Sequence, residues 1–341
     1  MKHILAALTI AVAAPAYADT FGPYSDLLVF GDSLSDAGNV DRLTGGAVPN
    51  PRVYPNGQFT NADTWAKQLG SDIGNPLTGE IQTNFAYGSA RAVENGDQIP
   101  DFGAQIDIFQ AVSPSLGDNP LAAVWFGGND LRDLGVDIFT ANAVAEALGT
   151  PAAELAATVN ALVTTKVSEI AASIAGGVLE LATQSGLDDF LVFLAPDLST
   201  APALVGTENA PLFFEIVQGT NAAIQFAVGQ VAAALPINVD FFDPNLVAAE
   251  IFADPAAFGL NPKLVTSQCY VPATQTSDAT FCGLDNASDY YFFDDIHPTE
   301  AVHSALADAV RAQVVPLPGG MSLALGGFVL LGFAARRKRA A

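Results

Sequence analysis

A serine at a strand-to-helix turn is the first residue of this chain that could perform nucleophilic chemistry. Ser33 follows an apolar run over 26–30 and stands where a strand would give way to a helix. A hydroxyl in such a turn is exposed, and the backbone N–H beside it carries the partial positive charge of a helix start, which favours an oxyanion. Taken alone, Ser33 is better explained as a helix N-cap than as a nucleophile.

The far end of the chain supplies a candidate base. Asp294 lies three residues before His297, and residues at i and i+3 of a turn or helical start face the same way. The Asp294 carboxylate can therefore fix the tautomer of His297 and leave the other ring nitrogen free to take a serine proton. Of the other two histidines, His3 lies in a leader-like segment and His303 in an expected helix, as a surface or packing residue. His297 is the default base, and a lone structural histidine is the alternative.

Two glycine-containing turns could complete a catalytic site. One expected strand ends at Gly88, and another is followed by Gly127, Gly128, Asn129 and Asp130. A glycine lets a backbone N–H approach a developing oxyanion, and an asparagine amide adds a second donor. Each turn by itself is an ordinary loop sequence. Together with Ser33 and His297, and in this order along the chain, the turns predict a site for acyl chemistry.

Five short apolar runs would position these residues. Most of them lack polar alternation, as expected of parallel strands covered on both faces. The runs span 26–30, 83–87, 121–126, 190–194 and 237–242. Helical stretches lie between and after them, at 62–69, 151–184, 211–234 and 298–314. This alternation predicts a single domain with a three-layer α/β architecture and a five-stranded parallel sheet. The Ala-rich stretch at 141–185 is long for one crossover and could form two helices.

The motifs in combination resemble those of GDSL-type SGNH hydrolases. The run from Phe30 to Asn39, with the sequence FGDSLSDAGN, is similar to the first block of that family. Gly88, the Gly127-x-Asn129-Asp130 turn and Asp294-x-x-His297 are similar to later blocks, and the similarity extends from about residue 26 to 314. The resemblance implies a flavodoxin-like α/β/α fold. Two further features look like the subfamily of plant GDSL lipases and secreted bacterial phospholipase (lecithinase)-like enzymes: Asn56-Gly57 followed by Trp65 and Leu69, and the run from Phe293 to Thr299.

The resemblance assigns a role to each site residue. It implies that Ser33 is the nucleophile, that His297 is the general base and acid, and that Asp294 orients the histidine. The backbone N–H groups of Ser33 and Gly88 and the side chain of Asn129 would form the oxyanion hole.

Other acidic residues near these motifs have weaker claims. Asp295 is the rival for the orienting role, but two residues before His297 it would point away from the ring. Asp32, Asp36 and Asp130 are expected to accept hydrogen bonds in turns. With two cysteines, three histidines and no close His/carboxylate spacing, the sequence predicts no metal and no cofactor.

The first residues have the pattern of a secretory signal peptide. A basic start is followed by an apolar run over 4–14 and by the small-residue motif Ala16-Tyr17-Ala18. We expect residues 1–18 to be removed, so that the mature chain begins at Asp19. A buried first helix is the alternative reading.

The last residues have the pattern of a short membrane anchor. A Val-Pro-Leu-Pro motif at 315–318 precedes an apolar stretch over 319–335 and four cations at 336–339. Such a stretch is near the minimum length for a membrane-spanning helix, and its basic end would stay cytoplasmic. An ordinary core helix is the alternative. Residues 316–341 resemble the PEP-CTERM (VPLPA-type) sorting tails of bacterial envelope proteins, which implies removal by a membrane peptidase.

Charge and cysteine content agree with export. Five of the 13 cations lie in the two terminal segments, so the body keeps eight against 36 carboxylates and a net charge near −28. Such a surface repels phosphate backbones, which excludes nucleic acid as a partner. Cys269 and Cys282 enclose 12 residues and are expected to form a disulfide, with two free buried thiols as the alternative.

The sequence thus predicts an exported serine esterase or lipase that hydrolyses carboxylic (acyl or lipid) esters through an acyl-enzyme. We expect a monomeric hydrolase domain over 19–315, in the cell envelope or outside the cell. The loop at 253–293, with Tyr270, Phe281, Tyr290 and Tyr291, would wall the site. Alternatives are an esterase or deacetylase of carbohydrate or polymer esters, acyl transfer to an acceptor other than water, and a non-catalytic envelope binding module.

Overall fold

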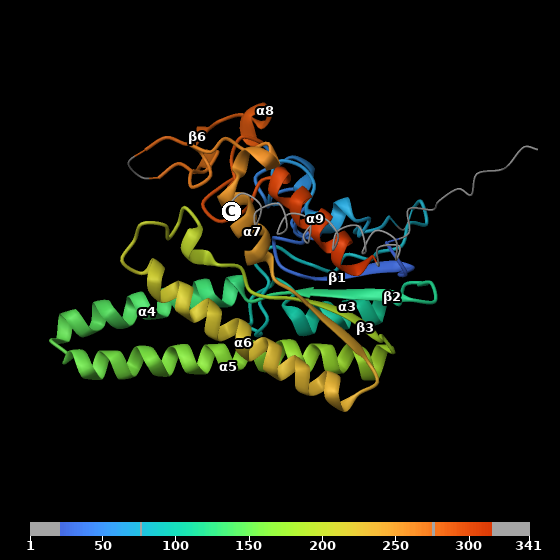
Figure 1. Ribbon diagram of the computed structural model, residues 1–341, viewed down its shortest axis with the longest axis horizontal. Coiled ribbons are helices and arrows are strands. Elements are labelled where there is room, and N and C mark those ends of the chain that lie inside the picture. Colours follow the sequence, from blue (N-terminus) through green and yellow to red (C-terminus); the bar gives the residue numbers. More distant parts are fainter. Residues whose placement is uncertain (1–20, 76, 275–276, 316–341) are drawn as a thin grey trace, which may run out of the picture.

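The computed structural model describes residues 21–75, 77–274 and 277–315 (Figure 1). The expected signal peptide at 1–18 and the expected tail at 316–341 lie outside the described residues. Strands and helices alternate along most of the described chain, as their apolar patterns predict.

The main sheet has four parallel strands among the described residues, in the order β1-β2-β3-β4. The strands are β1 (Asp26–Gly31), β2 (Pro120–Trp125), β3 (Asp189–Phe193) and β4 (Asn238–Phe242). The first three are buried along nearly their whole length, which explains their continuous apolar sequences. Because all four run in the same direction, the residues that follow them meet at one edge of the sheet.

The prediction of a fifth strand at 83–87 is wrong, and the hydrogen bonds of this segment show why. The segment 83–87 does lie beside β1, where Asn84 forms a single parallel bridge with Val29. At the next step, the N–H of Gly31 donates to Oε1 of Gln105 (3.0 Å), and Nε2 of Gln105 donates to the carbonyl of Gly31 (2.8 Å). The side chain of Gln105 thus takes the N–H of Gly31 from the ladder. The N–H of Tyr87 still donates to the carbonyl of Gly31 (3.1 Å), but the segment makes one bridge with β1 and is not a strand.

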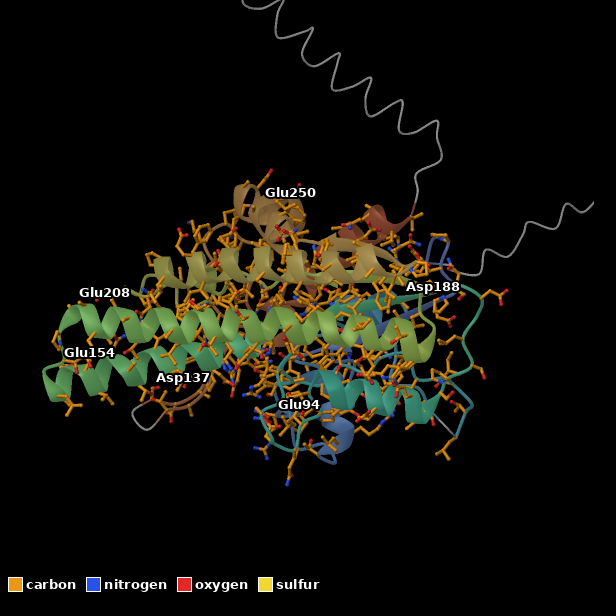
Figure 2. All side chains as sticks on the ribbon, turned by 90° about the horizontal axis from the view of Figure 1, so that it is seen from below. Glu94, Asp137, Glu154, Asp188, Glu208 and Glu250 are labelled. Atoms are coloured by element: carbon orange, nitrogen blue, oxygen red, sulfur yellow. A yellow bond between two sulfur atoms is a disulfide. The ribbon has the colours of Figure 1, made fainter. Side chains whose placement is uncertain are left out.

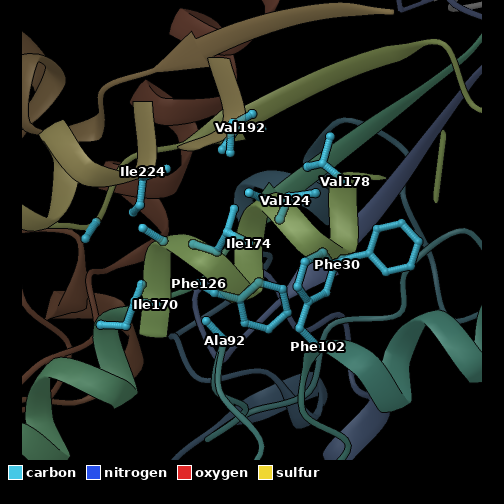
Figure 3. Packing of buried hydrophobic residues seen from close by; sticks show 14 of the residues in the cluster. Phe30, Ala92, Phe102, Val124, Phe126, Ile170, Ile174, Val178, Val192 and Ile224 are labelled. Atoms are coloured by element: carbon cyan, nitrogen blue, oxygen red, sulfur yellow. The ribbon is translucent and has the colours of Figure 1, made fainter. Parts of the chain in front are cut away.

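Helices cover both faces of the sheet and make the expected three layers. Alternate residues of β1 face opposite cores: Leu28 and Phe30 one, Leu27 and Val29 the other. The first face is covered by α3 (Phe102–Val112), α4 (Gly128–Leu148), α5 (Ala152–Ser185) and α6 (Ala210–Ala234). The second is covered by α2 (Trp65–Gln68), α7 (Pro244–Ala253) and α9 (Glu300–Val314). Figure 3 shows the first core, where Phe30, Phe102 and Phe126 pack beside Ile174 and Val178 of α5.

Short elements complete the described chain. They are α1 (Asn39–Leu43), η1 (Pro55–Gly57), η2 (Leu198–Thr200), η3 (Pro255–Phe258), β5 (Tyr270–Val271), β6 (Thr280–Phe281) and α8 (Leu284–Ala287). The strands β5 and β6 form an antiparallel pair beside the disulfide between Cys269 and Cys282, which confirms the expected pairing of the two cysteines.

The Ala-rich stretch contains the end of α4 and the whole of α5, two antiparallel helices, which is the possibility that its length left open. Helix α4 ends at Gly149, which has the left-handed conformation that favours glycine (φ 66°), and α5 begins after Pro151. The resulting hairpin projects beyond the sheet (Figure 1). Helix α5 is long and apolar enough to cross a membrane, yet it buries a stripe that includes Ile170, Ile174 and Val178 in the core. Carboxylates are spread over the outer surface, among them Asp137 and Glu154 of this hairpin (Figure 2).

Candidate active site

The fold brings Ser33, His297 and Asp294 into one chain of hydrogen bonds. Ser33 lies in the turn after β1, and the other two residues lie in the turn that leads into α9. Nε2 of His297 is 2.7 Å from Oγ of Ser33, and Nδ1 is 2.7 Å from Oδ2 of Asp294. Residues 264 positions apart in the chain are therefore in direct contact. This is the arrangement in which a histidine can move a serine proton.

A local turn between Asp294 and His297 holds the carboxylate against the imidazole ring. Oδ1 of Asp294 accepts the backbone N–H groups of Ile296 (3.0 Å) and His297 (2.7 Å), so Oδ2 is left to face the ring. The neighbouring carboxylate of Asp295 is exposed and makes no hydrogen bond to a described residue. Geometry therefore favours Asp294 over Asp295 as the partner of the ring.

The pair is electrostatically coupled. Burial opposes ionisation of Asp294, but the charge of His297 and the hydrogen bonds from His297 and Tyr54 lower its pKa to about 2. Burial also lowers the pKa of His297, but the charge and hydrogen bond of Asp294 outweigh it and leave that pKa raised above 6.5. His303 differs: it is buried in α9, and burial followed by the charge of His297 lowers its pKa to about 3. His303 is therefore a neutral packing residue.

The three donors expected to form the oxyanion hole differ in whether they already make a hydrogen bond within the protein. The N–H of Ser33 makes no hydrogen bond to any residue that the structure describes. Nδ2 of Asn129 donates to the carbonyl of Ala90 (2.9 Å), which leaves its second hydrogen available. Ser33 and Asn129 line the same cavity. The N–H of Gly88, by contrast, donates to Oδ2 of Asp36 (2.9 Å), so it is engaged in this state.

The carboxylates near the motifs do accept hydrogen bonds in turns. Asp32 accepts the N–H of Leu34 (3.0 Å). Asp130 accepts two backbone N–H groups, from Ala92 (2.9 Å) and Val93 (3.1 Å), and so ties the loop after Gly88 to the start of α4. Asp36 accepts from Gly38, Asn39, Val40 and Gly88. Burial nevertheless raises the pKa of Asp32 to about 7 and that of Asp36 to about 6.

Two aromatic residues of the site have no signal in the sequence. The hydroxyl of Tyr54 donates to Oδ2 of Asp294 (2.5 Å) from 240 residues away. The ring of Phe59 packs on the His297 ring, with centroids 5.3 Å apart. Neither residue belongs to a motif with a chemical signature, and only the tertiary structure places them here.

Replacing Gly88 with alanine tests this packing. An added Cβ would overlap the ring of Phe59, so we expect Gly88→Ala to displace that ring from His297. The free energy of unfolding should fall by about 1–3 kcal/mol, as for other overpacked cores. Thermal or urea unfolding measures the change. The matched control is Gly219→Ala in α6, where a Cβ meets nothing within 4 Å; equal effects of the two substitutions would contradict this role of Gly88.

A cavity of about 340 Å³ adjoins Ser33 and His297. It is lined mainly by apolar side chains, including Trp125, Leu198 and Phe252. Of the four aromatic residues expected in the wall, Tyr291 lines the cavity. Tyr270 and Phe281 pack instead around Tyr54 and Phe293, and Tyr290 lies beside the same cluster.

The comparisons with known proteins agree with the motifs. The profile of the GDSL-like Lipase/Acylhydrolase family matches residues 27–310. The chain therefore belongs to this family, which is one of carboxylic ester hydrolases.

Three curated bacterial proteins are similar over most of the chain. The secreted effector protein SseJ of Salmonella typhimurium is 25% identical and matches 84% of this chain and 63% of its own length. The thermolabile hemolysin of Vibrio parahaemolyticus is 23% identical, and the match covers 83% of this chain and 62% of the hemolysin. The phosphatidylcholine-sterol acyltransferase of Aeromonas hydrophila is 23% identical, and the match covers 89% of this chain and 92% of the acyltransferase. The chain thus spans less than two thirds of the length of the first two relatives.

Proposed function

We propose that this protein is a serine esterase or lipase that hydrolyses carboxylic esters through an acyl-enzyme. The single observation that carries the proposal is the hydrogen-bond chain from Oγ of Ser33 through His297 to Asp294, with both contacts at 2.7 Å. A nucleophile, a base and an orienting carboxylate are the parts that two-step acyl transfer requires.

The reaction proceeds in two steps, acylation of Ser33 and hydrolysis of the acyl-enzyme. Nε2 of His297 takes the hydroxyl proton while Oγ of Ser33 bonds to the ester carbonyl carbon, and the carbonyl oxygen becomes an oxyanion. The N–H of Ser33 and the amide of Asn129 stabilise that oxygen, and Gly88 contributes once its N–H leaves Asp36. The intermediate collapses, and His297 gives its proton to the leaving alcohol. Water then attacks the acyl-serine with the same base and releases the acid.

We favour acyl or lipid esters as substrates. The apolar cavity beside Ser33 supports this class over acetylated sugars, whose hydroxyls would need polar partners. The relative named as a phosphatidylcholine-sterol acyltransferase is consistent with a phospholipase-like subfamily. It also keeps open acyl transfer to an alcohol in place of water. A panel of p-nitrophenyl esters together with acetylated xylan tests the choice, because preferential hydrolysis of acetylxylan would overturn it.

The main alternative is a binding module on the same scaffold. A fluorophosphonate probe distinguishes the two, because a nucleophilic serine is phosphonylated and a pure binding module is not. We expect stoichiometric labelling at Ser33. An unlabelled protein with a native melting profile would remove the enzymatic proposal.

We further propose that the chain is exported, with a signal peptide at 1–18, a hydrolase domain over 19–315 and a PEP-CTERM-like anchor at 316–341. The names of the secreted effector and the hemolysin support export. The mass of the protein recovered from the native host decides the boundaries. A mature chain that begins at Asp19 is expected, and retention of residues 1–18 would contradict the signal peptide.

The pH dependence of hydrolysis follows from the raised pKa of His297. The base must be neutral to accept the serine proton, and it is protonated below its pKa. We therefore expect kcat/KM to fall on acidification with a midpoint above 6.5, because Asp294 stabilises the imidazolium. A pH profile with a soluble ester measures the midpoint; one well below 6.5 would contradict the coupling.

A further inference from the structure

The cavity beside Ser33 crosses the ends of all four strands. Ser33 follows β1, Asn129 follows β2, Leu198 follows β3 and Asn245 follows β4, and all four residues line it. Adjacent strands are about 4.8 Å apart, so the path from β1 to β4 is about 14 Å long. Helices α6 and α7 also contribute to its lining, through residues such as Phe214 and Phe252. We refer to this cavity, which extends from the nucleophile across the ends of the strands, as the channel.

Its chemistry suits a hydrocarbon chain. Leu198 and Ala201 are buried and reach it from the loop after β3, and Phe252 and Ala248 reach it from α7. The carboxylates that line it, Asp32 and Asp197, lie near the strand ends; α6 and α7 contribute apolar side chains and the amides Gln218 and Asn245. A fatty acyl chain would bury apolar surface along the whole path, whereas a sugar would leave most of its hydroxyls without partners.

We propose that this channel is the acyl-chain site and that it selects medium-length acyl groups. The inference rests on the proposed ester hydrolysis at Ser33 and names the substrate class of that site. A volume of about 340 Å³ lies at the small end of ligand pockets, which span roughly 300–1,000 Å³, so the channel suits an acyl group of medium length better than a long one. Medium-length acyl groups are therefore expected to fill the channel, and an acetyl group to leave most of it empty. Ala248 of α7 lines the channel with a methyl group, so a larger side chain at this position would narrow it.

The chain-length profile of the wild-type protein is the first test. We expect kcat/KM for p-nitrophenyl esters to rise up to about fourfold per methylene, as burial of each group allows, until the channel is full. The profile should reach its maximum near decanoate. A protein that hydrolyses acetate at least as fast as decanoate would overturn the acyl-channel proposal while leaving the esterase proposal intact. A protein that hydrolyses no ester at any length contradicts the esterase proposal itself.

Substitution at Ala248 is the second test. Ala248→Phe narrows the channel, so the ratio of kcat/KM for decanoate to that for acetate should fall at least tenfold. The matched control is Ala253→Phe on the same helix, where the side chain is exposed and does not line the channel. Binding of decanoate to Ser33→Ala, measured by calorimetry, should be lost when Ala248→Phe is added. An unchanged ratio in a folded Ala248→Phe variant, or unchanged decanoate binding, would overturn the assignment.

A second inference concerns Tyr54, and it rests on a different observation. Three of the four hydrogen bonds to the Asp294 carboxylate come from its own turn, through Ile296 and His297. The fourth comes from the hydroxyl of Tyr54, which shares Oδ2 with Nδ1 of His297. A donor at this oxygen both fixes the carboxylate plane and draws off part of its charge.

Tyr54 is itself held by aromatic packing. Its ring lies 5.2 Å from that of Phe293 and 6.0 Å from that of Tyr270, each nearly perpendicular. Tyr270 follows Cys269 of the disulfide, so the covalently closed loop supports the tyrosine that holds Asp294. We infer that Tyr54 is a positioning residue that tunes the basicity of His297 through Asp294, given the proposed role of that pair.

The acid limb of the pH profile tests Tyr54. In Tyr54→Phe the carboxylate keeps its full charge and stabilises the imidazolium more strongly, so the pKa of His297 should rise. We expect kcat to fall several-fold and the acid limb of kcat/KM to move to higher pH. Tyr290→Phe is the matched control, because Tyr290 flanks the same cluster and its hydroxyl makes no hydrogen bond to a described residue. An acid limb in the same place as in wild type and in Tyr290→Phe, whatever the change in kcat, would overturn this inference.

Discussion

Ser33→Ala is expected to lower kcat for ester hydrolysis by about 10⁴- to 10⁶-fold, because it removes the atom that bonds to the substrate. The substitution deletes one buried oxygen and its contact to Nε2 of His297, and it leaves the turn after β1 in place. The fold should therefore persist, and the loss should appear in kcat. Steady-state hydrolysis of p-nitrophenyl esters measures it.

A parallel substitution of the base gives the matched comparison. His297→Ala should cost about as much as Ser33→Ala, and the double variant little more, because residues that act as one unit are not additive. Circular dichroism and thermal unfolding verify that each variant is folded. A Ser33→Ala protein with substantial activity would remove the nucleophile assignment, and an additive double variant would show that the two residues do not act together.

Asp294→Asn should lower kcat by about 10⁴-fold while changing the volume of the side chain very little. In the native turn Oδ2 of Asp294 accepts from Nδ1 of His297. An amide in that position cannot hold the ring in the tautomer that leaves Nε2 free, and it removes the charge that raises the pKa of His297. The acid limb of the pH profile should then move to lower pH as kcat falls.

Asp295→Asn is the control for this prediction. Asp295 is the adjacent carboxylate, but it is exposed and lacks a hydrogen bond to the ring. We expect this variant to retain kcat within a few-fold of wild type. If Asp295→Asn were the more damaging of the two, the orienting role would belong to Asp295.

The amino-acid sequence determined the local parts of this site. The three-residue spacing of Asp294 and His297 is a property of one turn, and the structure forms it with the two backbone N–H groups of that turn. Continuous apolar runs likewise identified β1 to β3, because strands buried on both faces need no polar alternation. The fourth strand, β4, alternates polar and apolar residues and is largely exposed except at Phe242. The sequence predicts that the Ala-rich stretch is helical, and its length leaves open whether it forms one helix or two.

The tertiary structure decided what depends on competition between distant groups. The segment 83–87 has the composition of a strand, but the side chain of Gln105 takes the ladder position on Gly31, and no local pattern reports such a contact. The N–H of Gly88 is held by Asp36 for the same kind of reason.

Side chains without a motif were likewise placed by the fold alone. Tyr54 reaches Asp294 across 240 residues because aromatic packing brings the loop before α2 against the disulfide loop. Apolar periodicity and turn spacing act over a few residues, so the sequence determines which elements form and which motifs they carry. Hydrogen-bond partners and cavity shape depend on how those elements pack, and only the folded chain specifies that.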